Sequence, residues 1–175
     1  TKYLMIIPDE IIEKDYGCGD PLGKIKKGDT VLDLGSGGGE VPYIVSQIVG
    51  ETGKVIGVDM NDDMLNLAKK YQNQMIERIG YDNVIFHKGK IQNLKLNLEE
   101  LDKYIQEHPA NNLDTYQSIK QYINYLENEM TMIKDNSIDV VISNCVLNLV
   151  STEDKESLFR EIYRVLKNGG KAVIS

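Results

Sequence analysis

The sequence predicts an α/β protein with a doubly wound, mostly parallel sheet covered by helices. Two observations support this prediction. Short runs of apolar and β-branched residues alternate with segments of helical periodicity, which is the pattern of successive βαβ units. The first apolar run also passes into a glycine-rich turn, as expected where a parallel strand leads into a helix. Five strands are expected, at residues 30–34, 54–59, 84–87, 138–143 and 171–175.

Apolar positions at helical spacing predict helices between these strands. Val41 begins one apolar stripe after the glycine-rich turn. Between residues 64 and 79, apolar residues recur at three- and four-residue steps, which predicts a single amphipathic helix ended by Gly80. Residues 151–154 have the pattern of a capped helix start, and residues 168–170, Asn-Gly-Gly, predict its stop. The buried face of this last helix is expected to hold Leu158, Phe159, Ile162 and Leu166.

The segment from 91 to 136 is much longer than the ~12 residues that a crossover between parallel strands needs. We interpret it as an insertion between the third and fourth strands. Two apolar helical stripes, broken at His108-Pro109, predict a helical hairpin over the sheet edge. The hairpin could serve packing alone or form a wall or lid over a pocket, and the sequence favours neither role.

The composition excludes several classes of protein. The chain has 175 residues, of which 41% are hydrophobic, so one domain can bury a core without disulfides or a structural metal. The net charge of −7 argues against nucleic acid as a partner. No apolar run approaches the ~20 residues of a membrane span, and no signal peptide is recognisable, so we expect a cytoplasmic protein with no membrane partner.

Both ends of the sequence suggest part of a longer protein. The chain starts at Thr1 rather than Met, and it stops within an apolar run that has the pattern of a strand. We therefore expect that a C-terminal part is missing and that the last strand has an unpaired edge. An exposed edge of this kind can associate with another chain.

Residues 33–39 carry the strongest functional signal. They form D-x-G-x-G-x-G directly after the first expected strand. Glycine tolerates positive φ and lets a ligand approach the bare backbone, while the following helix directs its amide groups toward the loop. The dinucleotide fingerprint G-x-G-x-x-G does not fit, because its sixth position is Glu40, which disfavours NAD. Asp33 can instead face the ammonium group of a cofactor that carries an amino acid.

Asp59 adds a second signal. It ends the second expected strand, roughly 20 residues after the glycine loop, where an acidic side chain accepts the hydroxyls of a ribose in folds of this kind. Ligands of open α/β sheets bind outside the carboxyl ends of the strands. Gly35, Asp59, Gly89 and Cys145 each end or follow an expected strand, so all four should meet at one edge. Cys18 precedes the first strand in a segment that could fold across this edge.

The glycine loop and Asp59 together resemble the class I S-adenosylmethionine-dependent methyltransferases over almost the whole chain. Their usual sheet has seven strands, so the resemblance implies a Rossmann-like fold truncated after the fifth. It implies S-adenosyl-L-methionine as the cofactor, with Asp59 on its ribose and Met60 against one face of its adenine. Its methionine part would lie on Asp33, Gly35, Ser36, Gly37 and Gly39, and the adenine rim would be Lys90, Ile91 and Gln92.

Two further segments resemble the arsenite S-adenosylmethionine methyltransferases. They are Asp-Tyr-Gly-Cys-Gly-Asp-Pro at 15–21 and Ser-Asn-Cys-Val-Leu-Asn-Leu at 143–149. The resemblance implies that Cys18 and Cys145 form the catalytic pair and bind trivalent arsenic beside the cofactor methyl group. Tyr16 and Asn144 would contact the cofactor. The substrate would be arsenite or its thiol conjugate, and the insertion is similar to that of members associated with arsenosugar formation.

The chain departs from this family because it has no third Cys, although many members use one from a C-terminal region. The expected organisation is an N-terminal segment with the thiol loop, 1–29, followed by a cofactor-binding domain, 30–175. Two alternatives stay open. Each Cys could be a buried apolar residue in a methyltransferase of another small metabolite, with an O, N or C acceptor. The pair could also belong to a metalloid-binding or sensing module without catalysis.

His87 and His108 have no metal-like or triad-like neighbours in the sequence and are expected to be structural.

Overall fold

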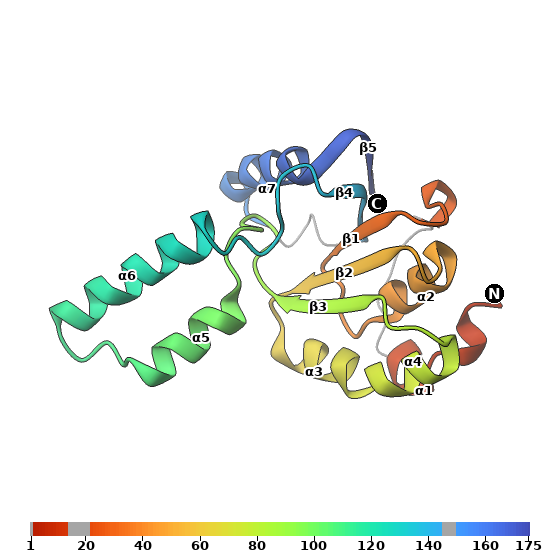
Figure 1. The fold of residues 1–175 in the computed structure, drawn as a ribbon, viewed down its shortest axis with the longest axis horizontal. Coiled ribbons are helices and arrows are strands. Elements are labelled where there is room, and N and C mark those ends of the chain that lie inside the picture. Colours follow the sequence, from red (N-terminus) through yellow and green to blue (C-terminus); the bar gives the residue numbers. More distant parts are fainter. Residues whose placement is uncertain (1, 14–21, 145–149) are drawn as a thin grey trace.

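The computed structural model describes residues 2–13, 22–144 and 150–175 (Figure 1). A five-stranded sheet has the order β3-β2-β1-β4-β5, and every neighbouring pair is parallel. The chain builds outward from β1 in one direction and then returns to the other side of β1, so the strand order reverses between β1 and β4. The strands are β1 (Thr30–Leu34), β2 (Lys54–Asp59), β3 (Val84–Lys88), β4 (Ile138–Ser143) and β5 (Leu166–Ile174).

Helices cover both faces of this sheet, as Figure 1 shows. The side chains of β1 alternate between the two faces: Val31 joins a buried cluster with α1–α4, whereas Leu32 and Leu34 join a cluster with α7. The described helices are α1 (Asp9–Ile12), α2 (Glu40–Val49), α3 (Asp62–Lys70), α4 (Gln72–Ile79), α5 (Leu98–Glu107), α6 (Leu113–Asn128) and α7 (Thr152–Val165), with short 3₁₀ turns at Leu4–Ile6 and Leu22–Lys24. No helix in the described ranges is long and apolar enough to cross a membrane.

The prediction of a single helix between residues 64 and 79 is wrong. This segment forms two helices, α3 and α4, which meet at Tyr71, where the backbone leaves the helical region at φ −96° and ψ 0°. Tyr71 donates a hydrogen bond to Glu10 of α1, and Lys70 forms an ion pair with the same carboxylate at 2.7 Å. Gly80 ends α4 with φ +95°, as predicted.

The end of α7 also differs from the prediction. Leu166 is extended and pairs with Ile138, so β5 begins there and the helix ends at Val165. Gly169 has φ +82°, and a Cβ on Gly170 would lie 2.9 Å from the carbonyl oxygen of Lys167. These glycines therefore lie in an irregular stretch of β5 rather than stopping the helix. Phe159, expected to be buried, is 52% exposed.

The insertion forms the predicted hairpin of α5 and α6, with the break at His108-Pro109. Figure 1 shows that it projects away from the sheet beyond the end of β3, whereas we predicted that it would lie over the edge. Its small core consists of Leu101, Ile119 and Leu126. This core leaves part of the predicted apolar stripes exposed, namely Ile105, Leu113, Tyr116 and Met130.

His87 of β3 gives a prediction for the pH dependence of stability. Burial lowers its pKa, Glu99 raises it, and Lys69 and Lys54 lower it, with a net pKa below the ordinary value. The folded state therefore holds fewer protons than the unfolded state just below about pH 6.5, and stability falls as the pH drops through this range.

We expect His87→Gln to make the free energy of unfolding less dependent on pH between 7.5 and 5.5. Urea denaturation at both pH values measures this change. If the free energy of unfolding of the variant fell between pH 7.5 and 5.5 as much as that of the unaltered protein, His87 would not be the cause of the pH dependence.

Candidate functional site

The glycine-rich loop between β1 and α2 is anchored on β2. The N–H groups of Gly35 and Ser36 both donate to the carbonyl oxygen of Val58, at 2.8 and 3.2 Å. Gly35, Gly37 and Gly39 have φ values of +78°, +51° and +93°, a region that favours glycine. The alternating glycines thus turn the chain sharply from the end of β1 into α2.

Asp59, at the end of β2, holds this loop directly. Its Oδ2 accepts a hydrogen bond from the N–H of Gly37 at 2.8 Å, and its Oδ1 accepts one from the N–H of Asn61 at 2.8 Å. Each carboxylate oxygen retains acceptor capacity, so the same side chain can still accept hydroxyl groups. The side chain of Asn61 in turn caps α3. The end of β2, the glycine loop and α3 are therefore connected.

Gly39 is enclosed by side chains from three elements. A Cβ on this residue would lie 3.0 Å from Phe86 and 3.1 Å from both Ala68 and Tyr43. Tyr43 donates a hydrogen bond to the carbonyl oxygen of Ala68 at 2.6 Å. Burial raises the pKa of Tyr43 above its ordinary value, and the negative charge of Asp82 raises it as well. Gly37 differs, because a Cβ there would meet nothing within 4 Å.

The predicted adenine contacts directly follow β2 and the strand next to it, β3. Met60 follows Asp59 and is 64% exposed. Residues 90–93 form a turn in which the N–H of Asn93 donates to the carbonyl oxygen of Lys90 at 3.0 Å. Ile91 is 8% exposed and packs in the core on the α7 side, so it can offer its backbone rather than its side chain to a ligand.

The other predicted residues also lie near the carboxyl ends of the strands. Asp33 is 3% exposed, and Ser36 is buried with its side chain close to Gly57. Within the described ranges, the Ser36 hydroxyl has no hydrogen-bond partner. Asn144 follows β4, and its side-chain oxygen accepts a hydrogen bond from Ser175 at 2.7 Å. The N–H of Gly89 donates to the carbonyl oxygen of Asp59 at 2.9 Å, as the predicted convergence requires.

Cys18, Cys145 and Tyr16 lie outside the described residues, so the predicted thiol pair is not placed. Among the residues that are described, no group of three or more His, Cys, Asp or Glu side chains could hold a metal ion. His108 is exposed and stacks on Tyr104, and its Nδ1 lies 3.0 Å from the carbonyl oxygen of Tyr104.

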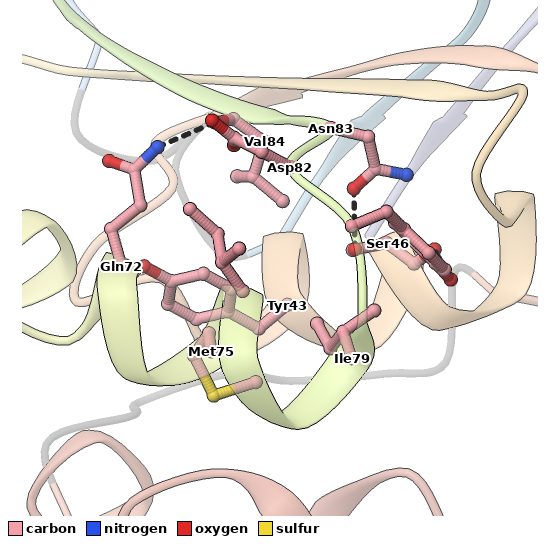
Figure 2. Close-up of a pocket in the computed structure, with 10 residues that line it drawn as sticks. Tyr43, Ser46, Gln72, Met75, Ile79, Asp82, Asn83 and Val84 are labelled. Atoms are coloured by element: carbon pink, nitrogen blue, oxygen red, sulfur yellow. Dashed lines mark hydrogen bonds between the residues drawn. The ribbon is translucent and has the colours of Figure 1, made fainter.

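A small cavity elsewhere does not contribute to this edge. Figure 2 shows it between α2, α4 and the start of β3. Its volume is about 10 Å³, which suits one water molecule. Ser46 and Asn83 hydrogen-bond to each other at its wall, at 2.6 Å. It lies at the amino end of β3, whereas the glycine loop and Asp59 lie at the carboxyl ends.

The comparisons with known proteins identify the family. A family model described as a methyltransferase domain matches residues 25–133, and a second model with the same description matches residues 107–174. The chain belongs to the methyltransferase domain family. Its sheet order and its structural neighbours confirm the predicted Rossmann-like fold of the class I methyltransferases.

Several relatives of this methyltransferase domain confirm the resemblance seen in the sequence. An arsenite methyltransferase of Aquipseudomonas alcaligenes is 36% identical over 95% of this chain, and human arsenite methyltransferase is 33% identical over 98%. This chain spans 38% and 37% of the lengths of those two relatives. The structure of an arsenic(III) S-adenosylmethionine methyltransferase from Chlamydomonas reinhardtii is 32% identical, with a TM-score of 0.73, and the match covers 99% of this chain and 46% of that one.

Two features of the site were not predicted. The first is the bond between Gly37 and Asp59. Predicting it requires the distance between two loops, which the sequence does not provide. The second is a set of carboxylates, Glu127, Asp154 and Glu161, that bind residues 92–94. Glu161 and Arg164 at i and i+3 form an ion pair on α7, a spacing that could have drawn attention to this region.

Gly39→Ala tests the packing of the glycine loop. We expect it to lower the free energy of unfolding by about 1–2 kcal/mol through left-handed strain and by about 1–3 kcal/mol more through crowding against Phe86, Ala68 and Tyr43. Gly37→Ala is the matched control, because it adds strain without crowding. Urea denaturation compares the two variants. Equal losses of stability would contradict the packing seen around Gly39.

Proposed function

We propose that this chain carries the cofactor-binding site of an S-adenosylmethionine-dependent methyltransferase that methylates trivalent arsenic. One observation carries the proposal: the glycine loop and Asp59 are hydrogen-bonded to each other at the carboxyl edge of the sheet. The arsenite methyltransferase relatives support the choice of substrate. The acidic net charge is in keeping with a small-molecule substrate rather than nucleic acid.

The residues at this edge suit S-adenosylmethionine. The open space above Gly37 can accept the amino-acid end of the ligand beside bare backbone. Asp59 offers a carboxylate to the ribose hydroxyls, and the exposed side chain of Met60 offers an apolar surface to the adenine. Asp33, buried beneath the loop, would supply negative charge toward the ammonium group.

The thiols of Cys18 and Cys145 would capture the substrate. Thiolates are soft donors that suit a soft metalloid, and they must lose their protons to bind it. When bound, S-adenosylmethionine supplies a methyl group on a positively charged sulfur, which the arsenic lone pair can attack as the carbon–sulfur bond breaks and S-adenosylhomocysteine leaves. The protein contributes by holding substrate and ligand in line, which can lower the barrier by several kcal/mol. Tyr16, beside Cys18 in the sequence, would help to set this angle.

A second candidate function is methyl transfer to carbon. A ubiquinone/menaquinone biosynthesis C-methyltransferase of Klebsiella pneumoniae is 28% identical over 86% of this chain. That alternative would leave both Cys residues without a chemical role. Replacing them would then leave methyl transfer intact, whereas the arsenic proposal expects a loss of methyl transfer.

The test measures S-adenosylhomocysteine formed from S-adenosylmethionine and arsenite in the presence of a thiol. We expect Cys18→Ser and Cys145→Ser each to reduce this rate by at least about a hundredfold, because the substrate is no longer held beside the methyl group. Binding of S-adenosylhomocysteine, measured by calorimetry, should be unchanged in both variants. Full turnover of arsenite by the double variant would contradict the thiol mechanism.

A further inference from the structure

Three consecutive residues that follow β3 are each bound by a carboxylate from another element. The side-chain amide of Gln92 donates to Asp154 at 3.4 Å, and that of Asn93 donates to Glu127 at 2.8 Å. The backbone N–H of Leu94 donates to Glu161 at 2.7 Å. Asp154 and Glu161 belong to α7, whereas Glu127 belongs to α6 of the insertion. Two separate elements therefore hold one short segment.

The carboxylates on α7 are themselves held in place. Ser151 donates a hydrogen bond to Asp154 at 2.9 Å. Arg164 binds both oxygens of Glu161, at 2.7 and 2.9 Å, and both side chains are largely buried. Arg164 also donates to the carbonyl oxygen of Ile133 at 2.9 Å. Since these carboxylates have fixed partners, they restrain residues 92 and 94 rather than follow them.

The two ends of the insertion meet at the same place. The N–H of Ile133 donates to the carbonyl oxygen of Leu94 at 3.0 Å, and the N–H of Met132 donates to that of Lys95 at 2.9 Å. The side chain of Met132 also lies so close to Gly89 that a Cβ there would be 2.7 Å from its methyl carbon. The hairpin in Figure 1 is thus attached at its base to the turn that leaves β3.

We infer that Glu127 of the insertion is a positioning residue for the adenine end of the cofactor. The inference rests on the proposed function, in which residues 90–92 form the adenine rim. Glu127 does not contact the ligand in this account. It binds Asn93, which closes the 90–93 turn through its N–H group, and so it sets the shape of the rim. The insertion therefore acts on cofactor affinity through its base, beyond packing alone.

Glu127→Leu, Glu127→Gln and Asn93→Ala test this inference by calorimetry with S-adenosylhomocysteine and with methylthioadenosine, which lacks the amino-acid end. Glu127→Leu removes the acceptor, and we expect about three- to tenfold weaker binding of both ligands. Glu127→Gln retains an acceptor oxygen and should bind as the unaltered protein does. Asn93→Ala should weaken binding to a similar extent, and combining it with Glu127→Leu should add no further loss.

Glu107→Gln is the matched control, because Glu107 is an exposed carboxylate on the same insertion. It should leave both affinities unchanged. Equal affinity of Glu127→Leu and the unaltered protein would overturn the inference while leaving the proposed function intact. Additive losses in the double variant would also overturn it, because the two residues would then act separately. Failure of the unaltered protein to bind either ligand would overturn the proposed function and this inference together.

Discussion

The carboxylate of Asp59 is the interaction on which the candidate site depends. Its two oxygens accept N–H groups from two different loops, one at Gly37 and one at Asn61. A carboxylate can do this because it has two acceptor oxygens and no donor. The bond to Gly37 adds a side-chain contact to the backbone bonds by which Gly35 and Ser36 hold the glycine loop on β2. A ligand that spans both loops therefore meets two loops that are already held together.

The rest of the edge is arranged around this contact by the strand order. Because β1 lies in the middle of the sheet and the order reverses beside it, the ends of β2, β1 and β4 are neighbours. Asp59, the glycine loop and Asn144 follow these three ends. Residues 92–94, which follow β3, are held by carboxylates of α6 and α7 instead of by the sheet. The candidate site thus combines a side built by the sheet with a side held by α7 and by α6 of the insertion.

Much of this arrangement could be predicted from the sequence, because it depends on local patterns. The bounds of β1, β2 and β4 agree with the prediction, since each is a short apolar run bordered by glycine or polar residues. The break of the insertion at Pro109 follows from the missing N–H of proline. The positions of the glycine loop and Asp59 at one edge follow from the parallel sheet alone.

The features that were missed depend on contacts between distant residues. Tyr71 interrupts a continuous apolar stripe, and its partner Glu10 lies in another helix. Gly169 and Gly170 have the composition of a helix stop, but the pairing of Leu166 with Ile138 places them inside β5. Glu127 looks like any surface carboxylate in the sequence, and only the fold brings it to Asn93.

Calorimetric titration of S-adenosylhomocysteine into Asp59→Asn measures how much the Asp59 carboxylate contributes to ligand binding. The amide keeps one acceptor oxygen but turns an N–H₂ group toward one of the two backbone N–H donors, which disrupts the loop contact and the ribose contact together. We expect binding at least about thirtyfold weaker than in the unaltered protein, or about 2 kcal/mol, whereas the control Asp63→Asn on the exposed start of α3 should bind normally. Binding by Asp59→Asn within twofold of the unaltered protein would contradict this expectation.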